Sequence, residues 1–201
     1  MKLTSISLSF ASAAALVSCV PMQTAPQSNY LDGYSQQDLS ETIMHNGSPA
    51  AGGYWDGDGV TGKPLIRINI DEQKAFYFKG GQLVGISPLS TGIEGRETPK
   101  GTFRVTEKDI DHKSSLYGVI RDTATGQVVN HDAKVGRDRP GPGQVFERAP
   151  MLNFMRFNGA IGMHTGHLPG YAASHGCVRM PDRMAQIFYQ NTPMGTTVIV
   201  E

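Results

Sequence analysis

Apolar and polar residues alternate along several stretches of the chain beyond Pro64. At residues 66–70 three isoleucines alternate with polar side chains, a period of two that predicts a half-buried β-strand. The Phe-Tyr-Phe run at 76–78 predicts a second strand. Two glycines at 80–81 then form a compact reversal into a third predicted strand at 83–86. The region after Pro64 therefore begins as a β-hairpin meander.

The rest of the chain contains more strand signals and one helix signal. Pro181 suits the first turn of a helix, and after it Met184, Ile187 and Phe188 have the i, i+3, i+4 spacing of one apolar helical face. Many short strands, turns rich in Gly and Pro, and one late helix indicate a mainly β fold, a sandwich or a barrel. The further predicted strands are 101–105, 117–121, 127–129 and 197–200.

The first residues form a distinct segment. Lys2 precedes an uncharged, mostly apolar run at 3–17, which is too short to cross a bilayer as a helix but fits a secretory signal. The run ends in Leu-Val-Ser-Cys19, which resembles the lipobox of bacterial lipoproteins. This resemblance implies a signal peptide at 1–18, acylation of Cys19 and a lipid-anchored protein in the periplasm. Val20 after the cysteine implies the outer membrane. The alternative is an ordinary signal peptide that is cleaved elsewhere.

The domain organisation follows from a change in composition. Residues 19–62 lack apolar periodicity and are rich in Gln, Ser, Gly, Pro and Asn, so we predict a linker in which Trp55 docks on the folded domain. Residues 63–201 form the predicted folded domain. The 18 basic and 18 acidic side chains balance, which argues against a nucleic-acid partner.

Candidate chemistry is concentrated between residues 161 and 179. Three of the six histidines and one of the two cysteines lie in this segment. If Cys19 is lipidated, Cys177 has no disulfide partner in an oxidising compartment, and such a thiol is a candidate nucleophile. A nearby imidazole is expected to lower the pKa of the thiol by ion pairing and then to protonate a leaving amine. Gly176 permits a tight turn, and backbone N–H groups around it are expected to stabilise an oxyanion.

Several ordered motifs resemble one known family. Ser174-His175-Gly176-Cys177-Val178-Arg179 resembles the signature of the L,D-transpeptidase catalytic domain, the YkuD family. Ser90-Thr91-Gly92, Thr98-Pro99-Lys100-Gly101-Thr102-Phe103 and the closing strand at 195–200 resemble further family elements. The resemblance covers roughly residues 64–201. It implies an L,D-transpeptidase-like β-sandwich with one or two short helices.

The resemblance also implies residue roles. Cys177 is the expected nucleophile and His164 the general base and acid, with the backbone carbonyl of Thr165 orienting the His164 ring. His175 and Gly176 are expected to position the nucleophile loop. The residues expected to contact substrate are Arg179, Ser174 and Tyr171.

The implied reaction is an acyl transfer on peptidoglycan. The family attacks the L,D-linkage of a tetrapeptide stem, holds the acyl group as a thioester on the cysteine, and passes it to an amine, forming a 3→3 cross-link. Some members attach a lipoprotein to the wall, which would then be a partner, or exchange an amino acid. No cofactor and no metal are expected. The alternatives are a hydrolase of the same fold (an L,D-carboxypeptidase or amidase) and a non-catalytic, lipid-anchored wall-binding module.

Other interpretations of the same residues remain open from sequence. Cys177 could be a buried structural thiol, and His164 a core histidine at a strand end. His164, His167, His175 and Cys177 also offer the ligand types that zinc prefers, although 161–181 contains no carboxylate to support such a site. Cys177 follows His164 by 13 positions, fewer than is common in the family, which implies a trimmed cap over the substrate groove.

Overall fold

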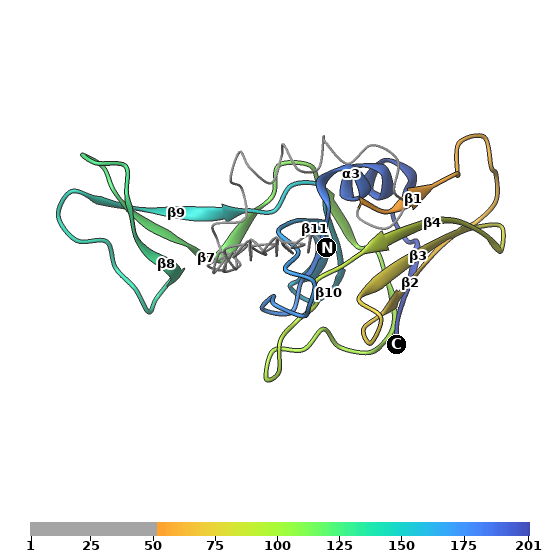
Figure 1. Ribbon diagram of the computed structural model, residues 1–201, viewed down its shortest axis with the longest axis horizontal. Coiled ribbons are helices and arrows are strands. Elements are labelled where there is room, and N and C mark those ends of the chain that lie inside the picture. The colour runs from red at the N-terminus through yellow and green to blue at the C-terminus, as the bar shows by residue number, and fades with distance from the viewer. Residues whose placement is uncertain (1–51) are drawn as a thin grey trace, which may run out of the picture.

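The computed structural model describes residues 52–201, so Cys19, the predicted signal peptide and most of the predicted linker lie outside the described residues. Figure 1 shows an elongated molecule in which an arm of three strands projects from a body of strands and one helix, α3 (Asp182–Asn191). Within residues 52–201, no helix has the length and apolar character needed to cross a bilayer. The strands are β1 (Tyr54–Trp55), β2 (Pro64–Asn69), β3 (Lys74–Lys79), β4 (Gln82–Pro88), β5 (Gly101–Arg104), β6 (Glu107–Asp109), β7 (Lys113–Asp122), β8 (Val128–Lys134), β9 (Gln144–Pro150), β10 (Phe154–Asn158), β11 (Ile161–Thr165), β12 (Val178–Met180) and β13 (Thr197–Val200).

The strands form three sheets. The first has the order β1-β4-β3-β2-β13-β5, the second β12-β11-β10-β6, and the third, which is the arm, β8-β7-β9. Most neighbouring strands are antiparallel, but β13 pairs with β2 and β12 with β11 in parallel. The predicted mainly β architecture with a short helix is confirmed.

The strands that sequence periodicity missed lie mostly in the second sheet. In β10 the consecutive residues Phe154 and Met155 are both fully buried. In β11 the run from Gly162 to Thr165 is buried at every position. A strand that is covered on both faces has no apolar–polar alternation, so a period-two pattern could not reveal it.

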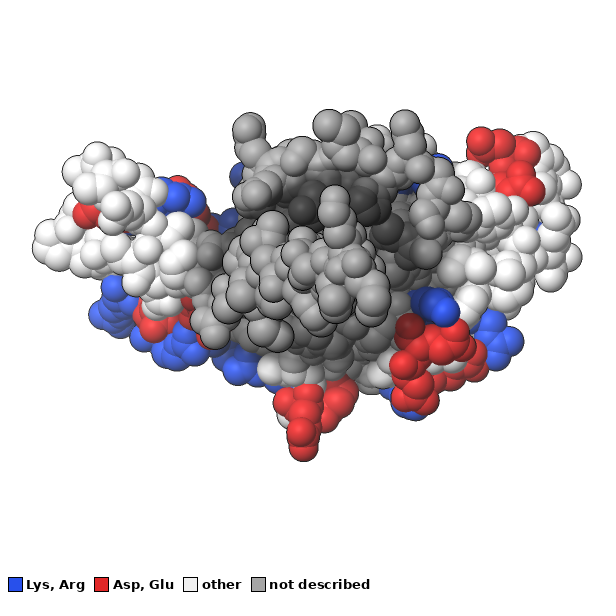
Figure 2. Space-filling view, viewed as in Figure 1, with Lys and Arg blue, Asp and Glu red and all other residues white. Residues whose placement is uncertain are grey.

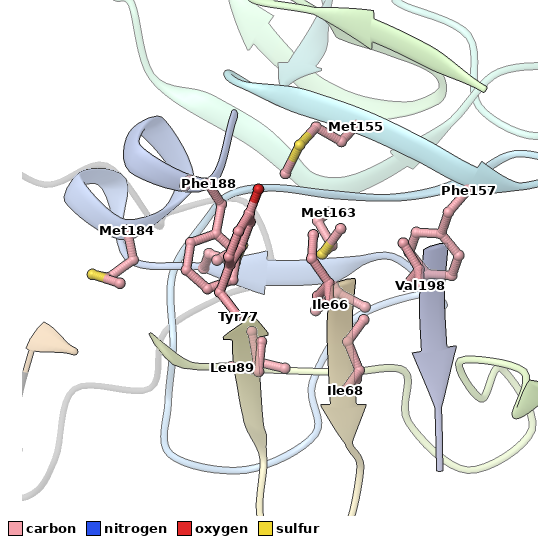
Figure 3. Close-up of a cluster of buried hydrophobic side chains, with 14 of the residues drawn as sticks. Ile66, Ile68, Tyr77, Leu89, Met155, Phe157, Met163, Met184, Phe188 and Val198 are labelled. Atoms are coloured by element: carbon pink, nitrogen blue, oxygen red, sulfur yellow. The ribbon is translucent and has the colours of Figure 1, made fainter. Parts of the chain in front are cut away.

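The core lies where α3 packs against the first and second sheets. Figure 3 shows Met184 and Phe188 of α3 beside Tyr77 of β3, with Met163 of β11 and Val198 of β13 completing the contact between the sheets. Ile66 and Ile68, the alternating residues of the first predicted strand, are fully buried here. This packing joins the sheet that carries the closing strand β13 to the sheet that carries the catalytic motif.

Trp55 docks on this core, as predicted. Its ring lies 5.3 Å from that of Tyr77 and 6.2 Å from that of Phe188, and β1 pairs with β4. The Tyr77 hydroxyl donates a hydrogen bond to the carbonyl of Asn191 at the end of α3. Lys79 donates to the Gly57 carbonyl and the Asn191 side chain. The last part of the predicted linker is therefore attached to the body.

Replacing Phe188 should destabilise the whole fold. Phe188→Ala removes a fully buried ring that contacts Tyr77 at 5.0 Å, and we expect a loss of about 3–5 kcal/mol in the free energy of unfolding. Urea denaturation followed by circular dichroism measures this loss. Gln186→Ala, at an exposed position of the same helix, is the control and should change stability by less than about 0.5 kcal/mol. Equal effects of the two substitutions would contradict the assigned core.

Candidate active site

The parallel pair β11–β12 brings the two segments that carry the predicted catalytic residues side by side. His164 lies directly opposite Arg179 in the register, and Cys177 precedes Arg179 by two residues. Because residues paired across neighbouring strands point to the same side of a sheet, His164 and Arg179 share a face, and Cys177 lies at the end of the loop, immediately before β12. On the other face Met163 and Val178 pack into the core. The two parallel strands thus bring together residues that are 13 positions apart in the chain.

The Ser90-Thr91-Gly92 motif holds the loop between these two strands. Ser90 forms backbone hydrogen bonds with Arg179 in both directions, and its hydroxyl donates to the carbonyl of Tyr171. The Thr91 carbonyl accepts from the N–H groups of Ala173 and Ser174. A loop without regular structure must find partners for its backbone polar groups, and Ser90 and Thr91 supply them here.

Thr98, the first residue of the motif at 98–103, binds Gly176, the residue before the candidate nucleophile Cys177. Its hydroxyl donates to the Gly176 carbonyl at 2.8 Å and accepts from the Gly92 N–H at 3.0 Å. Gly92 has no room for a side chain, because a Cβ there would lie 2.0 Å from the Arg96 carbonyl oxygen. Gly176 has a φ of +112°, a conformation that favours glycine. The separate motifs therefore meet at the turn before Cys177.

Ser174 spans this same turn. Its hydroxyl accepts from the Gly176 N–H and donates to the Cys177 carbonyl, and the residue is almost fully buried. The Gly176 N–H, which we expected to face an oxyanion, is thus engaged within the loop. The Ser174 hydroxyl, predicted to contact substrate, is placed to brace the nucleophile turn.

Arg179 and Tyr171, the other predicted substrate contacts, are placed differently from each other. Arg179 is buried, and its guanidinium donates to the carbonyls of His167 and Ala173, so it holds the two ends of the loop. The Tyr171 side chain is 63% exposed and open to a ligand.

The His164 ring is oriented by a backbone carbonyl. Its Nδ1 lies 2.7 Å from the carbonyl oxygen of Thr165, which is the contact that the resemblance implies. With the proton on Nδ1 donated there, Nε2 is left as the basic nitrogen. The Thr165 hydroxyl is itself held, accepting from the Asn153 side-chain amide and donating to Asp182.

Burial sets the resting protonation of both groups. Removal from water lowers the pKa of His164 to about 4, although the Thr165 carbonyl opposes this shift. Burial also raises the pKa of the Cys177 thiol, opposed by the Gly162 N–H and by the charges of Arg156 and Arg179. The expected thiolate–imidazolium ion pair therefore does not describe this state, because near neutral pH both groups are uncharged. His164 is suited to accept the thiol proton during attack.

In this state the thiol lies 3.8 Å from the carbonyl of Ala160, at the turn between β10 and β11. The Cys177 residue as a whole is partly exposed.

The chain matches the family described as YkuD, the L,D-transpeptidase catalytic domain, over residues 63–200. It belongs to this family. A probable L,D-transpeptidase of Salmonella typhimurium, ErfK/SrfK, is 24% identical over 138 residues, which are 66% of this chain and 42% of that protein. This chain thus spans less than half the length of that curated relative.

Solved structures share the fold of this YkuD protein. An L,D-transpeptidase from Mycobacterium smegmatis has a TM-score of 0.50 at 20% identity, covering 69% of this chain and 58% of that one. An L,D-transpeptidase from Xylanimonas cellulosilytica also has a TM-score of 0.50, at 23% identity, covering 71% of this chain and 62% of that one. Both confirm the L,D-transpeptidase-like fold.

The arm of this YkuD protein supplies a wall that sequence analysis did not anticipate. Tyr117 of β7 packs on His175 with ring centroids 4.4 Å apart. Burial, and then the charge of Arg96, lower the pKa of His175 to about 4. The short interval between His164 and Cys177 predicts a trimmed cap, and on the side of His175 the arm contributes the Tyr117 ring. The sequence predicts a strand at 117–121, but no local pattern indicates that Tyr117 contacts the loop that carries His175.

The zinc hypothesis finds no support in the donor geometry. Within residues 52–201, the one group of three or more His, Cys, Asp or Glu side chains close enough to share a metal is Glu107, Asp109 and His112. This group does not include the histidines of the motif or Cys177. Glu107 is paired with Arg156 at 2.7 Å, and the His112 ring stacks on Phe154 at 4.1 Å, so these side chains have structural partners.

Stability should fall as pH decreases from 6.5 towards 4. The pKa of His164 is about 4 in the folded chain and 6.5 ordinarily, so in this window the unfolded chain binds more protons. The contribution of the neutral His164 ring to the free energy of unfolding is fully present above pH 6.5. It is lost as the pH falls through this window, and the total loss is on the order of 3 kcal/mol. Urea denaturation at pH 7.5, 5.5 and 4.5 measures the loss.

His164→Asn is the comparison for this measurement. The variant should have a shallower dependence of unfolding free energy on pH, and the part due to His175 should remain. The same pH dependence in both proteins would contradict the assigned burial of His164.

Proposed function

We propose that this protein is a cysteine L,D-transpeptidase acting on peptidoglycan tetrapeptide stems. The observation that supports this most is the arrangement at β11–β12: His164 of β11 is oriented through Nδ1 by the Thr165 carbonyl, and the partly exposed Cys177 immediately precedes β12, the strand that pairs with β11. Membership of the YkuD family supports the same reaction class.

In the proposed first step the Cys177 sulfur attacks the carbonyl carbon of the L,D-peptide bond. His164 Nε2 accepts the thiol proton, and the Cys177–carbonyl bond forms as a tetrahedral intermediate. The carbon–nitrogen bond then breaks, and the imidazolium donates its proton to the leaving amine. The products are a thioester on Cys177 and a free D-amino acid.

In the second step an amine of another stem attacks the thioester carbonyl. His164 removes a proton from that amine, a new amide bond forms, and the sulfur leaves and recovers the proton from the imidazolium. If water takes the place of the amine, the same site is a hydrolase. That is the second candidate function, and it differs only in the identity of the acceptor.

Acylation of Cys177 tests the proposal. The Cys19→Ser chain is the background, because it has a single thiol. Incubated with a carbapenem, it should gain one covalent mass on Cys177 by intact-protein mass spectrometry. His164→Gln should slow the addition by about 10²–10⁴-fold through loss of the general base. Cys177→Ala should gain no mass.

The products formed from a peptidoglycan fragment distinguish transpeptidation, hydrolysis and wall binding. With a disaccharide-tetrapeptide, a cross-linked dimer supports transpeptidation, whereas a tripeptide supports hydrolysis. Cys177→Ala should lower product formation at least about a thousandfold. Unchanged turnover in Cys177→Ala would contradict the cysteine mechanism. The wall-binding module would be favoured if the Cys177→Ala chain and its parent both bound purified sacculi and neither formed a product.

We also propose that Cys19 carries a lipid anchor and that the domain faces the periplasm at the outer membrane. The motif at 16–19 supports this location. Expressed in a Gram-negative host with labelled palmitate, the wild-type chain should incorporate label and fractionate with outer membranes. Cys19→Ser should do neither, and Ser18→Ala is the control for a neighbouring substitution. Label in Cys19→Ser would contradict the anchor.

A further inference from the structure

The hydroxyl of Thr165 joins two polar side chains that the proposed mechanism does not use. The side-chain amide of Asn153 donates to this hydroxyl at 3.2 Å, and the hydroxyl donates to Oδ1 of Asp182 at 3.2 Å. The carbonyl oxygen of the same residue lies 2.7 Å from Nδ1 of His164. Thr165 therefore connects the ring of the candidate base to one amide and one carboxylate.

Most of this chain of contacts is removed from water. His164, Thr165 and Asn153 are each less than one tenth exposed, whereas the residue at the far end, Asp182, is exposed. A buried polar group that loses its partner has no water to replace it. The hydrogen bonds of the Thr165 hydroxyl therefore constrain the position of that residue more firmly than exposed ones would.

Backbone hydrogen bonds act on the same peptide unit. The Thr165 carbonyl and the Gly166 N–H belong to one planar unit, so they turn together. The Gly166 N–H donates to the Met180 carbonyl at 2.9 Å, and the Thr165 N–H donates to the Leu152 carbonyl at 2.9 Å. The direction of the carbonyl that contacts His164 thus depends on where the backbone and the hydroxyl of Thr165 are held.

Asn153 links the turn before β10 to this point. Its backbone has a φ of +57°, a left-handed conformation that Asn adopts more readily than most other residues. Its N–H donates to the Ile110 carbonyl at 3.0 Å. The turn is therefore bound to Thr165 twice, through the Leu152 carbonyl and through the Asn153 amide.

Asp182 links the same point to the helix. It is the first residue of α3, whose Met184 and Phe188 are buried in the core. A carboxylate is favourable at this position because the N-terminus of a helix carries a partial positive charge. Since core packing fixes α3, the acceptor for the Thr165 hydroxyl is held independently of His164.

Asp182 is used differently from the acids of the arm. Figure 2 shows Lys and Arg side chains along the lower side of the arm. On the arm the acid Glu147 pairs with Arg121, and both side chains are partly exposed. Such exposed ion pairs contribute little to stability. Asp182 instead accepts from a hydroxyl whose own residue is buried against the candidate base.

The carbonyl of Thr165 matters because a neutral imidazole has two tautomers. When the proton is on Nδ1, Nε2 of His164 can accept the proton of the Cys177 thiol. When the proton is on Nε2, that nitrogen is a donor and cannot act as the base. A carbonyl aimed at Nδ1 selects the first tautomer.

We propose that Asp182 and Asn153 are positioning residues for the general base: through the Thr165 hydroxyl they hold the carbonyl that selects the Nδ1–H tautomer of His164. The catalytic meaning of this inference rests on the proposed function. The tautomer itself is a property of the folded chain and can be measured without substrate.

The experiment reads the tautomer by NMR in the Cys19→Ser chain with ¹⁵N-labelled histidine at pH 7.5, where the His164 ring is neutral because its pKa is about 4. His164→Asn identifies the signals of that ring. The parent should show the Nδ1–H tautomer. Asp182→Ala, and Asn153→Gly, which keeps the left-handed backbone accessible, should each add a measurable Nε2–H population.

Conservative variants separate positioning from a loss of folding. Thr165→Val removes the hydroxyl at nearly constant shape and should give the same mixture, whereas Thr165→Ser should restore the parent tautomer. Asp182→Asn, which keeps an acceptor oxygen, should also retain it. Arg183→Gln, at the next exposed position of α3, is the matched control and should leave the tautomer unchanged. If Asp182→Ala fails to fold, the Val and Ser variants of Thr165 decide the question.

Acylation by a carbapenem gives the second measurement. Asp182→Ala and Asn153→Gly should lower the maximal rate constant of acylation by about three- to tenfold and leave the half-saturating concentration unchanged, because the base and not the binding surface is altered. Altered tautomers in a chain that is never acylated would keep the positioning role and reject the proposed function. The parent tautomer in Thr165→Val, Asp182→Ala and Asn153→Gly overturns the inference, as does an unchanged rate constant in variants whose tautomer has shifted.

Discussion

The position of Cys177 depends on the hydrogen bonds that tie the segment from Ser90 to Thr98 to the loop that ends at the cysteine. That loop has little regular structure of its own, so its backbone groups need partners from elsewhere. Ser90 and Thr91 bind residues 171–174, and Thr98 binds the Gly176 carbonyl. These contacts hold the turn that leads into Cys177.

Burial of the Cys177 thiol and the His164 ring also affects the chemistry. Keeping the Cys177 thiol and the His164 imidazole neutral avoids the cost of placing two charges away from water. In the proposed mechanism charge then develops as the substrate is attacked, in surroundings where the Thr165 carbonyl already holds the imidazole and can stabilise its protonated form. Thr165 is in turn fixed by Asn153 and Asp182, so the first turn of α3 contributes to the orientation of the base.

The arm gives the site a wall from a distant part of the sequence. Its three strands pair only with one another in the sheet order, and the Tyr117 ring packs against His175. A wall built on a separate sheet can vary in its side chains without disturbing the core in which Phe188 and Met163 pack.

Sequence alone determined the elements whose cause is local. The alternation at 66–70 predicted a strand because one face is buried and the other is not, and the spacing of Met184 and Phe188 predicted α3 for the same reason. The motifs around Cys177 and His164 identified the family, because a reaction requires particular side chains in a particular order.

Tertiary structure decided what depends on contacts between distant residues. Strands β10 and β11 were hidden because both of their faces are covered. The inward orientation of Arg179, the hydrogen bond that engages the Gly176 N–H, and the contact of Tyr117 with His175 each involve a choice of partner that local sequence does not specify. The directions of the pKa shifts of Cys177 and His164 follow from desolvation, which is set by every atom that surrounds the two groups once the chain has folded.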